Sequence, residues 1–318
     1  MTTDISSANP LTASADEQLR RKARLEAILE NGLPPFQHTV VQLMSVLNDP
    51  SADVKKAAGP ISTDPTLSAQ ILRMCNSPLF SRRTRVITIE QAVGMLGTDR
   101  LRSLAMTSSL AGFAGQGLPK DQVASFWQHS FLAALLSKYL AEYNGYAEKE
   151  QAYIAGLLHD IGQVPQWMLA AEEVARTKSA IVQGWLDNPG VERSYFGINH
   201  CDLGGLMAAS WGLLPSFVDV IHNHHQPSEA EHDPYLVEIV AAVEHFLLAK
   251  EELAPASADA GVSSGDAPVP EIPAITERSH SPYDEETWKN ISEHLYNEHN
   301  RVLPLVEESL TSMIGSTR

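Results

Sequence analysis

Apolar residues at helical spacing, interrupted by proline-marked stops, are the feature that most constrains the fold of this chain. In "QVASFWQHSFLAALLSKYLAEY" and "PYLVEIVAAVEHFLLAKEEL", apolar side chains return every three or four residues, as in an amphipathic helix. Stops that combine a capping residue with a proline occur at Asn48–Pro50, Thr63–Pro65 and Asn76–Pro78, and they predict short helices between residues 40 and 78. Convincing alternation of apolar and polar residues is absent. The sequence therefore predicts an all-α fold.

The composition is that of an acidic globular protein with ample core material. The chain has 318 residues, of which 43% are hydrophobic and 19% charged, and its formal net charge is −16. This charge argues against a general binder of nucleic acid or of anionic membranes. No apolar stretch approaches the ~18 residues of a spanning helix, and "MTTDISSANP" does not have the pattern of a secretory signal. The two cysteines, Cys75 and Cys201, are expected to be reduced thiols packed in a cytoplasmic protein.

Changes in composition along the chain predict its organisation. Residues 1–15 are rich in Ser, Thr and Ala and are expected to form a disordered tail. A helical body is expected over residues 16–253. Residues 254–282 are rich in Ala, Ser, Gly and Pro, which favours a flexible loop or linker. Helical spacing returns over 283–318, and these C-terminal helices are expected to pack on the body because an isolated amphipathic helix is only marginally stable.

Histidines and carboxylates interrupt the apolar helices at five places. The doublet His159-Asp160 closes an apolar run in "AYIAGLLHDIGQVPQW", and burying such a pair is costly unless both groups find partners. The candidate metal ligands are His129, His159, Asp160, His200, His224, His225 and Glu244. Facing helices commonly build metal sites from such side chains, and imidazoles with carboxylates suit Zn, Fe or Mn. The alternative is that these histidines are hydrogen-bonded core residues. His222 and His245 are interpreted in that way, or as exposed residues.

Arginines gather in "FSRRTRVI" and on the helix that follows it. The candidate anion-binding residues are Arg82, Arg83, Arg85, Arg100 and Arg102. Guanidinium groups pair with phosphate or carboxylate in a bidentate manner, so a nucleotide, a phosphorylated receiver domain or an acidic protein surface would fit them. A solvated loop with local ion pairs is the alternative.

Several motifs together resemble those of one family. They are "LPPF" (33–36), "ISTDPTLSAQILRMCNSP" (61–78), "ITIEQAVGMLG" (87–97), "FGINHCDLGGLMAASWGLL" (196–214) and "HNHHQP" (222–227). On these motifs, the segment from Leu33 to about Leu253 resembles an HDOD domain, the HD-related output domain of bacterial signalling proteins. The resemblance implies a helical bundle in two halves, about 33–120 and 121–253. It also implies that the second half is related to the HD superfamily of metal-dependent phosphohydrolases.

The resemblance also assigns roles to the candidate ligands. His129 matches the first histidine of the HD superfamily, and His159 and Asp160 match its doublet, whose aspartate bridges two ions in the binuclear HD-GYP relatives. These relatives carry further histidines where His200, His224 and His225 stand here. Their final aspartate is expected at the position of Glu244. By resemblance, Asp160 would thus bridge two ions that polarise a water molecule between them.

Four departures from the HD-GYP pattern weaken the case for catalysis. The lysine expected three residues after the doublet aspartate is Gln163, and the Gly-Tyr-Pro signature is replaced by "HHQPSEAEHDPY". A glutamate ligand of some relatives, one turn before the first histidine, is Ser125, and the final aspartate is Glu244. Hydrolysis of cyclic di-GMP is therefore not expected.

Two functions remain open. In the first, the chain is a signalling and regulatory protein that acts by protein–protein interaction and has no catalytic turnover. Its expected partner is a receiver, kinase or cyclase-type protein, and neither nucleic acid nor a membrane is an expected partner. The missing lysine and Gly-Tyr-Pro loop favour it. In the second, the chain is a metal-dependent phosphohydrolase acting on a nucleotide or cyclic dinucleotide, which the near-complete ligand set favours.

Overall fold

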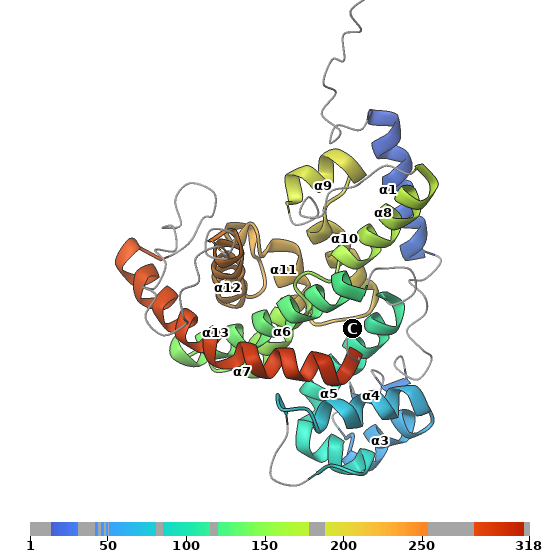
Figure 1. Cartoon of the computed structure of the whole chain (residues 1–318), viewed down its shortest axis with the longest axis vertical. Helices are drawn as coiled ribbons and strands as arrows, with labels where there is room; N and C mark the ends of the chain where they lie inside the picture. The colour runs from blue at the N-terminus through green and yellow to red at the C-terminus, as the bar shows by residue number, and fades with distance from the viewer. Residues whose placement is uncertain are drawn as a thin grey trace, which may run out of the picture.

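Helices make up the regular structure of the described chain (Figure 1). The computed structural model describes residues 14–30, 42–43, 46–47, 49, 51–80, 85–114, 120–177, 188–253 and 283–314. Within these ranges no strand occurs, so the predicted all-α fold is confirmed. Most of the expected tail and the whole of the expected linker over 254–282 lie outside the described residues.

The N-terminal half is built around α3 (Val54–Ser62), α4 (Pro65–Cys75) and α5 (Ile89–Ala114), which lie together at the bottom of Figure 1. The side chain of Asp53 accepts a hydrogen bond from the Lys56 N–H and so caps α3. At Gly97, α5 has a positive φ of 74°, where the sequence predicts a break between two helices.

Asn76, in the "NSP" motif that follows α4, joins the two ends of the loop leading to α5. Its Nδ2 donates to the carbonyl oxygens of Leu72 and Val86, and its Oδ1 accepts from the Val86 N–H at 2.9 Å. The next residue, Ser77, is buried and donates to the Met74 carbonyl oxygen. This motif is therefore structural: it fixes the path of the chain between α4 and α5.

The C-terminal half contains seven α-helices and one turn of 3₁₀-helix among the described residues. They are α6 (Lys120–Tyr143), α7 (Lys149–Leu158), α8 (Gln163–Thr177), α9 (Pro189–Phe196), α10 (His200–Ser210), α11 (Pro215–Asn223), η1 (Pro227–Glu229) and α12 (Pro234–Leu253). The helix expected to end near Gly162 ends at Leu158 instead, and α8 begins at Gln163 after a tight turn.

Two glycines allow the elements of this half to approach closely. A Cβ atom on Gly156 of α7 would lie 2.6 Å from the Ala133 carbonyl oxygen of α6. A Cβ atom on Gly162, in the turn after α7, would lie 2.0 Å from the His200 carbonyl oxygen of α10. Both are below any normal contact distance, so only glycine fits at either position without displacing a neighbour. Gly156 thereby allows α7 to lie against α6, and Gly162 allows the α7–α8 turn to lie against α10.

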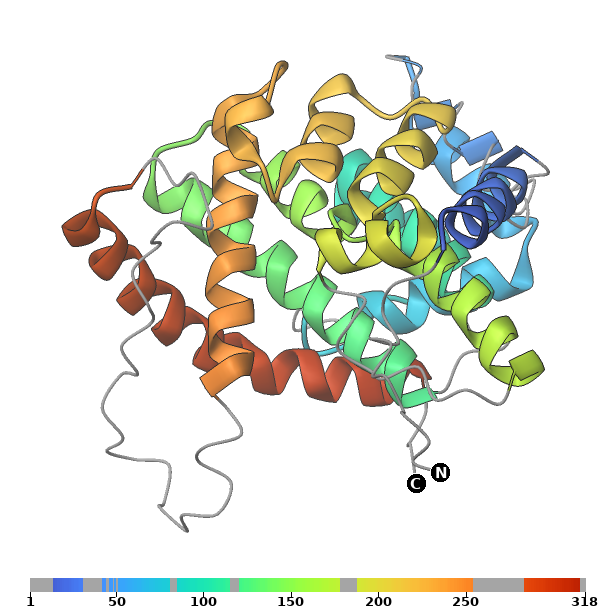
Figure 2. The same ribbon diagram turned by 90° about the horizontal axis from the view of Figure 1, so that it is seen from above.

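The helix α13 (Glu285–Ile314) connects the two halves. It is one continuous helix, packs along α6 and reaches α4, as the views from the front and from above both show (Figures 1 and 2). Trp288, Ile291 and Leu295 lie on its buried face. Near its other end, the Ser309 hydroxyl accepts a hydrogen bond from the Leu79 N–H at 3.2 Å. At the opposite side of the molecule, α1 (Ala15–Glu30) packs on α9.

Candidate metal centre

Asp160 lies at the centre of the polar cluster, in the turn between α7 and α8. One carboxylate oxygen, Oδ2, lies 3.5 Å from His129 Nε2 and 3.4 Å from His159 Nε2. The other oxygen, Oδ1, lies 3.3 Å from His200 Nε2 and 3.4 Å from His224 Nε2. The carboxylate therefore faces a different pair of imidazoles with each of its oxygens.

The first set of donors, here called the Glu244 group, comprises His129, His159, Asp160 and Glu244. Its four donor atoms all lie within 4.8 Å of one another. Glu244, on α12, brings its Oε2 to 3.0 Å from His129 Nε2 and 3.1 Å from His159 Nε2. The side chains of His159, Asp160 and Glu244 are at most 6% exposed, whereas that of His129, on α6, is 16% exposed.

The second set, here called the Cys201 group, comprises His200, Cys201, His224 and His225. Its four donor atoms also lie within 4.8 Å of one another. His200 and Cys201 open α10, and the double histidine follows α11. His200 Nε2 lies 3.3 Å from His224 Nε2. The structure thus brings all seven predicted ligands into two adjacent groups, and it adds a cysteine.

Hydrogen bonds on the far side of three rings fix which ring nitrogen faces the cluster. His159 Nδ1 donates to the Gly156 carbonyl oxygen at 2.8 Å, and His224 Nδ1 donates to that of Ile221 at 3.1 Å. His200 Nδ1 donates to the carboxylate of Glu192 at 2.8 Å. When these rings are neutral, the proton on Nδ1 leaves the lone pair of Nε2 free, so three lone pairs would converge around Asp160.

The acidic and basic side chains of this arrangement shift one another's pKa values. Burial would raise the pKa of Asp160, but His159 and His224 hold the pKa of that carboxyl well below its ordinary value. Burial would lower the pKa of His224, but Cys201 and Asp160 raise it to about 10. For Cys201, burial would raise the pKa, but His224 and His200 lower it to about 7. Protons or metal ions can neutralise these converging groups, and the N, O and S donors fit divalent transition metals.

Sequence reasoning missed two members of this centre. Glu192, on α9, is fully buried, accepts from the His200 N–H at 2.6 Å and holds the His200 ring. Cys201 was expected to be a packed thiol, yet its Sγ lies 3.3 Å from His200 Nε2. The acidic residue eight positions before His200 gave no sequence signal, because "NPGVERSYF" resembles any surface helix. The only signal for Cys201 was its position beside His200.

Gln163 occupies the position at which the resemblance to HD-GYP proteins would place a lysine. The residue is 5% exposed, and its Nε2 donates to Asp160 Oδ2 at 2.9 Å. A neutral amide therefore contacts the central carboxylate. Because it carries no charge, it cannot balance the anionic charge of a phosphate as an ammonium group would.

The structure does not gather the predicted anion-binding arginines into one described patch. Arg82 and Arg83 lie outside the described residues, as does the side chain of Arg102, and Arg85 is exposed. The Arg100 guanidinium pairs with Glu150, with nitrogen–oxygen distances of 2.9 and 3.0 Å. Arg100 is therefore engaged in the bundle.

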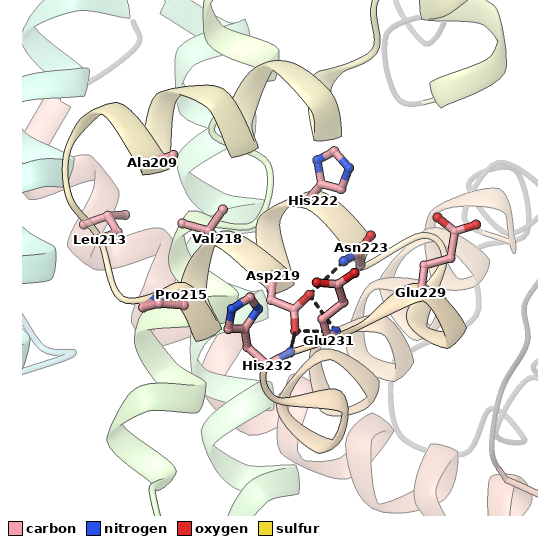
Figure 3. Close-up of a pocket in the computed structure, with 10 residues that line it drawn as sticks. All are labelled: Ala209, Leu213, Pro215, Val218, Asp219, His222, Asn223, Glu229, Glu231 and His232. Carbon is pink, nitrogen blue, oxygen red and sulfur yellow. Dashed lines mark hydrogen bonds between the residues drawn. The ribbon is translucent and has the colours of Figure 1, made fainter.

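A separate pocket of about 560 Å³ lies beside α10, α11 and the loop that follows the double histidine (Figure 3). On its wall, Asp219 accepts hydrogen bonds from the N–H groups of Glu231, His232 and Asp233. Burial would raise the pKa of Asp219, but these backbone donors lower it. Asp219 thus anchors the loop that follows the double histidine.

None of the helices in the described residues is long and apolar enough to cross a membrane.

Comparison with known proteins places these features in context. The family model of the HDOD domain matches residues 33–227. An uncharacterized protein of Treponema pallidum (strain Nichols) is 24% identical over 217 residues, or 66% of this chain and 41% of that protein. The chain thus spans about two fifths of the length of the curated relative that it matches.

Solved structures share the fold. An HDOD domain protein of unknown function from Geobacter sulfurreducens is 24% identical with a TM-score of 0.61, covering 92% of this chain and 98% of that one. A Shewanella amazonensis SB2B protein, provisionally named a phosphohydrolase, is 24% identical with a TM-score of 0.63, covering 90% and 98%. A Marinobacter aquaeolei VT8 protein, provisionally named a signal transduction protein, is 18% identical with a TM-score of 0.61, covering 96% and 68%.

Proposed function

This chain belongs to the HDOD family, and on that premise we propose that its C-terminal half binds two divalent metal ions. We also propose that the protein acts in signal transduction by binding another protein. In this proposal the metal centre organises the bundle, and the surface of the organised bundle carries the signal. A receiver, kinase or cyclase-type protein is the expected class of partner.

One observation carries the proposal of metal binding: each oxygen of Asp160 faces its own set of donors. Among the described residues, the buried Oδ1 makes no hydrogen bond, although two imidazole nitrogens lie within 3.4 Å of it. An unsatisfied buried carboxylate oxygen costs free energy, and a shared cation removes that cost. His129, His159 and Glu244 would hold the first ion, the histidines of the Cys201 group would hold the second, and Asp160 would contact both.

Two features favour a signalling role over turnover. Gln163 contributes a neutral dipole where a phosphate-binding lysine is expected. Loss of one charged donor of this kind commonly lowers a reaction rate ~10²-fold or more. In addition, the donor residues are nearly all buried, which suits a centre that holds helices together. The provisional name of the Marinobacter aquaeolei protein points in the same direction.

Metal content and thermal unfolding test this proposal. Purified protein should contain close to two equivalents of Fe, Mn or Zn. Removal of the metal by a chelator should lower the midpoint of thermal unfolding, and adding the metal back should restore it, because the ions bind only the folded state. Asp160→Ala should bind less metal and should lose this response. Protein that retains no metal after incubation with all three ions would contradict the proposal.

A metal-dependent phosphohydrolase is the second candidate, favoured by the near-complete set of buried histidines and carboxylates around Asp160. Bound ions would supply Lewis acidity at a phosphoryl group, while Gln163 would orient Asp160. Cyclic dinucleotides and nucleotides, incubated with the Mn-, Fe- or Zn-loaded protein, distinguish the two candidates. The signalling proposal expects no turnover above a metal-free control. Robust hydrolysis that disappears in Asp160→Ala would establish the enzyme instead.

A further inference from the structure

Cys201 lies inside the second donor set rather than in an apolar core. We propose that it is a thiolate ligand of the second metal position, which makes that position selective for a thiophilic ion such as Zn²⁺. This inference rests on the proposed binding of two metal ions and adds the chemical identity of one of the positions.

The geometry of α10 places the sulfur among the imidazoles. Cys201 Sγ lies 3.3 Å from His200 Nε2 and 4.0 Å from His224 Nε2, and the residue is 4% exposed. The side chain of Asn199 caps α10 by accepting from the Asp202 N–H at 2.8 Å. This cap fixes the first turn of the helix, so His200 and Cys201 enter the centre together.

A second observation points to an ion at this position. Oδ1 of Asp160 is buried, makes no hydrogen bond within the described part of the chain, and faces the Cys201 group. The tautomers of His200 and His224 direct the Nε2 lone pairs into the same space. One cation there would be shared by sulfur, nitrogen and the orphaned carboxylate oxygen. If the thiol merely filled space and the rings were neutral, this oxygen would face two Nε2 lone pairs and no donor.

The two positions then differ in donor chemistry. The Glu244 group offers two imidazoles and two carboxylates, which suits Mn or Fe. The Cys201 group offers three imidazoles and a thiolate, together with the second oxygen of Asp160. Soft sulfur donors favour Zn²⁺ and, as a spectroscopic substitute, Co²⁺. The chain is therefore built to hold two ions of different preference.

Cobalt titration of the full chain tests the assignment. Cobalt(II) bound to a thiolate gives a charge-transfer absorption in the near ultraviolet, and cobalt bound to nitrogen and oxygen alone does not. Wild-type protein, stripped of metal and titrated with Co²⁺, should develop this band. Cys201→Ser should lose the band, and its affinity for the second ion should fall at least tenfold, while one ion remains bound.

Cys75 provides the matched control. It is also buried, but it lies at the end of α4 in the N-terminal half, and burial raises the pKa of its thiol to about 11. The chain has only two cysteines, so in Cys75→Ser the sole remaining thiol is that of Cys201. The charge-transfer band should persist in Cys75→Ser. Its persistence would identify Cys201 as the thiolate ligand even if Cys201→Ser fails to fold.

The outcomes separate the two proposals. Two bound cobalt ions without the band, or a band that survives in Cys201→Ser, would overturn the thiolate assignment and leave metal binding intact. A band that disappears in Cys75→Ser would also overturn it. Protein that binds no cobalt at all would overturn both.

Discussion

At the residue scale, the buried carboxylate of Glu192 orients His200 within the proposed metal centre. It accepts from the backbone N–H and from Nδ1 of His200, so both the ring orientation and the tautomer depend on it. Groups of this kind, one step removed from a metal, typically change its affinity 10–100-fold when they are replaced. Glu192 therefore acts as a positioning residue for the Cys201 group.

Glu192→Gln should weaken binding of the second metal ion about tenfold or more and leave the first ion in place, because glutamine keeps the shape but not the charge that holds Nδ1–H. Titration of metal-free protein with Zn²⁺ measures both affinities. Glu229→Gln, in η1, is the control and should bind both ions as the wild type does. Equal loss of the two ions would instead mean that Glu192 supports the fold in general.

The candidate site could be predicted in part from the sequence, and the reason lies in individual residues. His159 and Asp160 stand out because a polar pair within an apolar run demands a partner. Glu192 gives no such signal, since its burial depends on how α9 turns back against α10. Cys201 is ambiguous for a similar reason: a buried thiol and a thiolate ligand look alike until the histidines of α11 are placed beside it.

At the scale of elements, the turn between α7 and α8 shows how close packing positions Asp160. The sequence predicts helix through this doublet, but the helix ends at Leu158 because Gly162 must pass directly against the backbone of α10. By contrast, the break at Gly97 could be predicted, since a glycine between two helical patterns is a local signal. Contacts between distant elements leave no such local mark.

Gly162→Ala should destabilise the protein by ~2 kcal/mol or more, because its Cβ would overlap the His200 carbonyl oxygen and the Gly204 nitrogen. Chemical unfolding of metal-free protein measures the change. Gly94→Ala, in α5, has nothing within 4 Å of the new Cβ and should be neutral or stabilising by roughly 0.5–1 kcal/mol. Similar stability of the two variants would show that the turn can move away from α10.

At the scale of the whole molecule, α13 contacts both halves and so connects the half that carries the candidate metal centre to the N-terminal half. Its amphipathic spacing could be predicted, but its route along α6 to α4 could not, because that route depends on the surfaces presented by two separate bundles. Between α12 and α13, Lys250 donates to the ring of His299, which is 6% exposed. Because His299 can titrate, we expect the packing of α13 against α12 to depend on pH.

Burial, assisted by the charge of Lys250, lowers the pKa of His299 to about 4. In the unfolded chain the pKa of histidine is near 6.5. As the pH falls from about 6.5 towards 4, His299 is protonated in the unfolded state but stays neutral in the folded state. The free energy of unfolding therefore decreases over this pH window, and above it His299 has no effect on stability. Lys250, whose pKa burial lowers to about 8, stays charged throughout the window and adds no dependence of its own.

Unfolding free energies measured between pH 7 and 5 should therefore fall more steeply for wild type than for His299→Gln, by roughly 1 kcal/mol after allowance for partial solvent screening. Glutamine can still accept from Lys250 but does not titrate. His294→Gln, at an exposed position of the same helix, should follow the wild type. If His299→Gln and wild type lose stability in parallel over this range, the docking of α13 does not depend on a neutral imidazole, and the acid sensitivity of the molecule arises elsewhere.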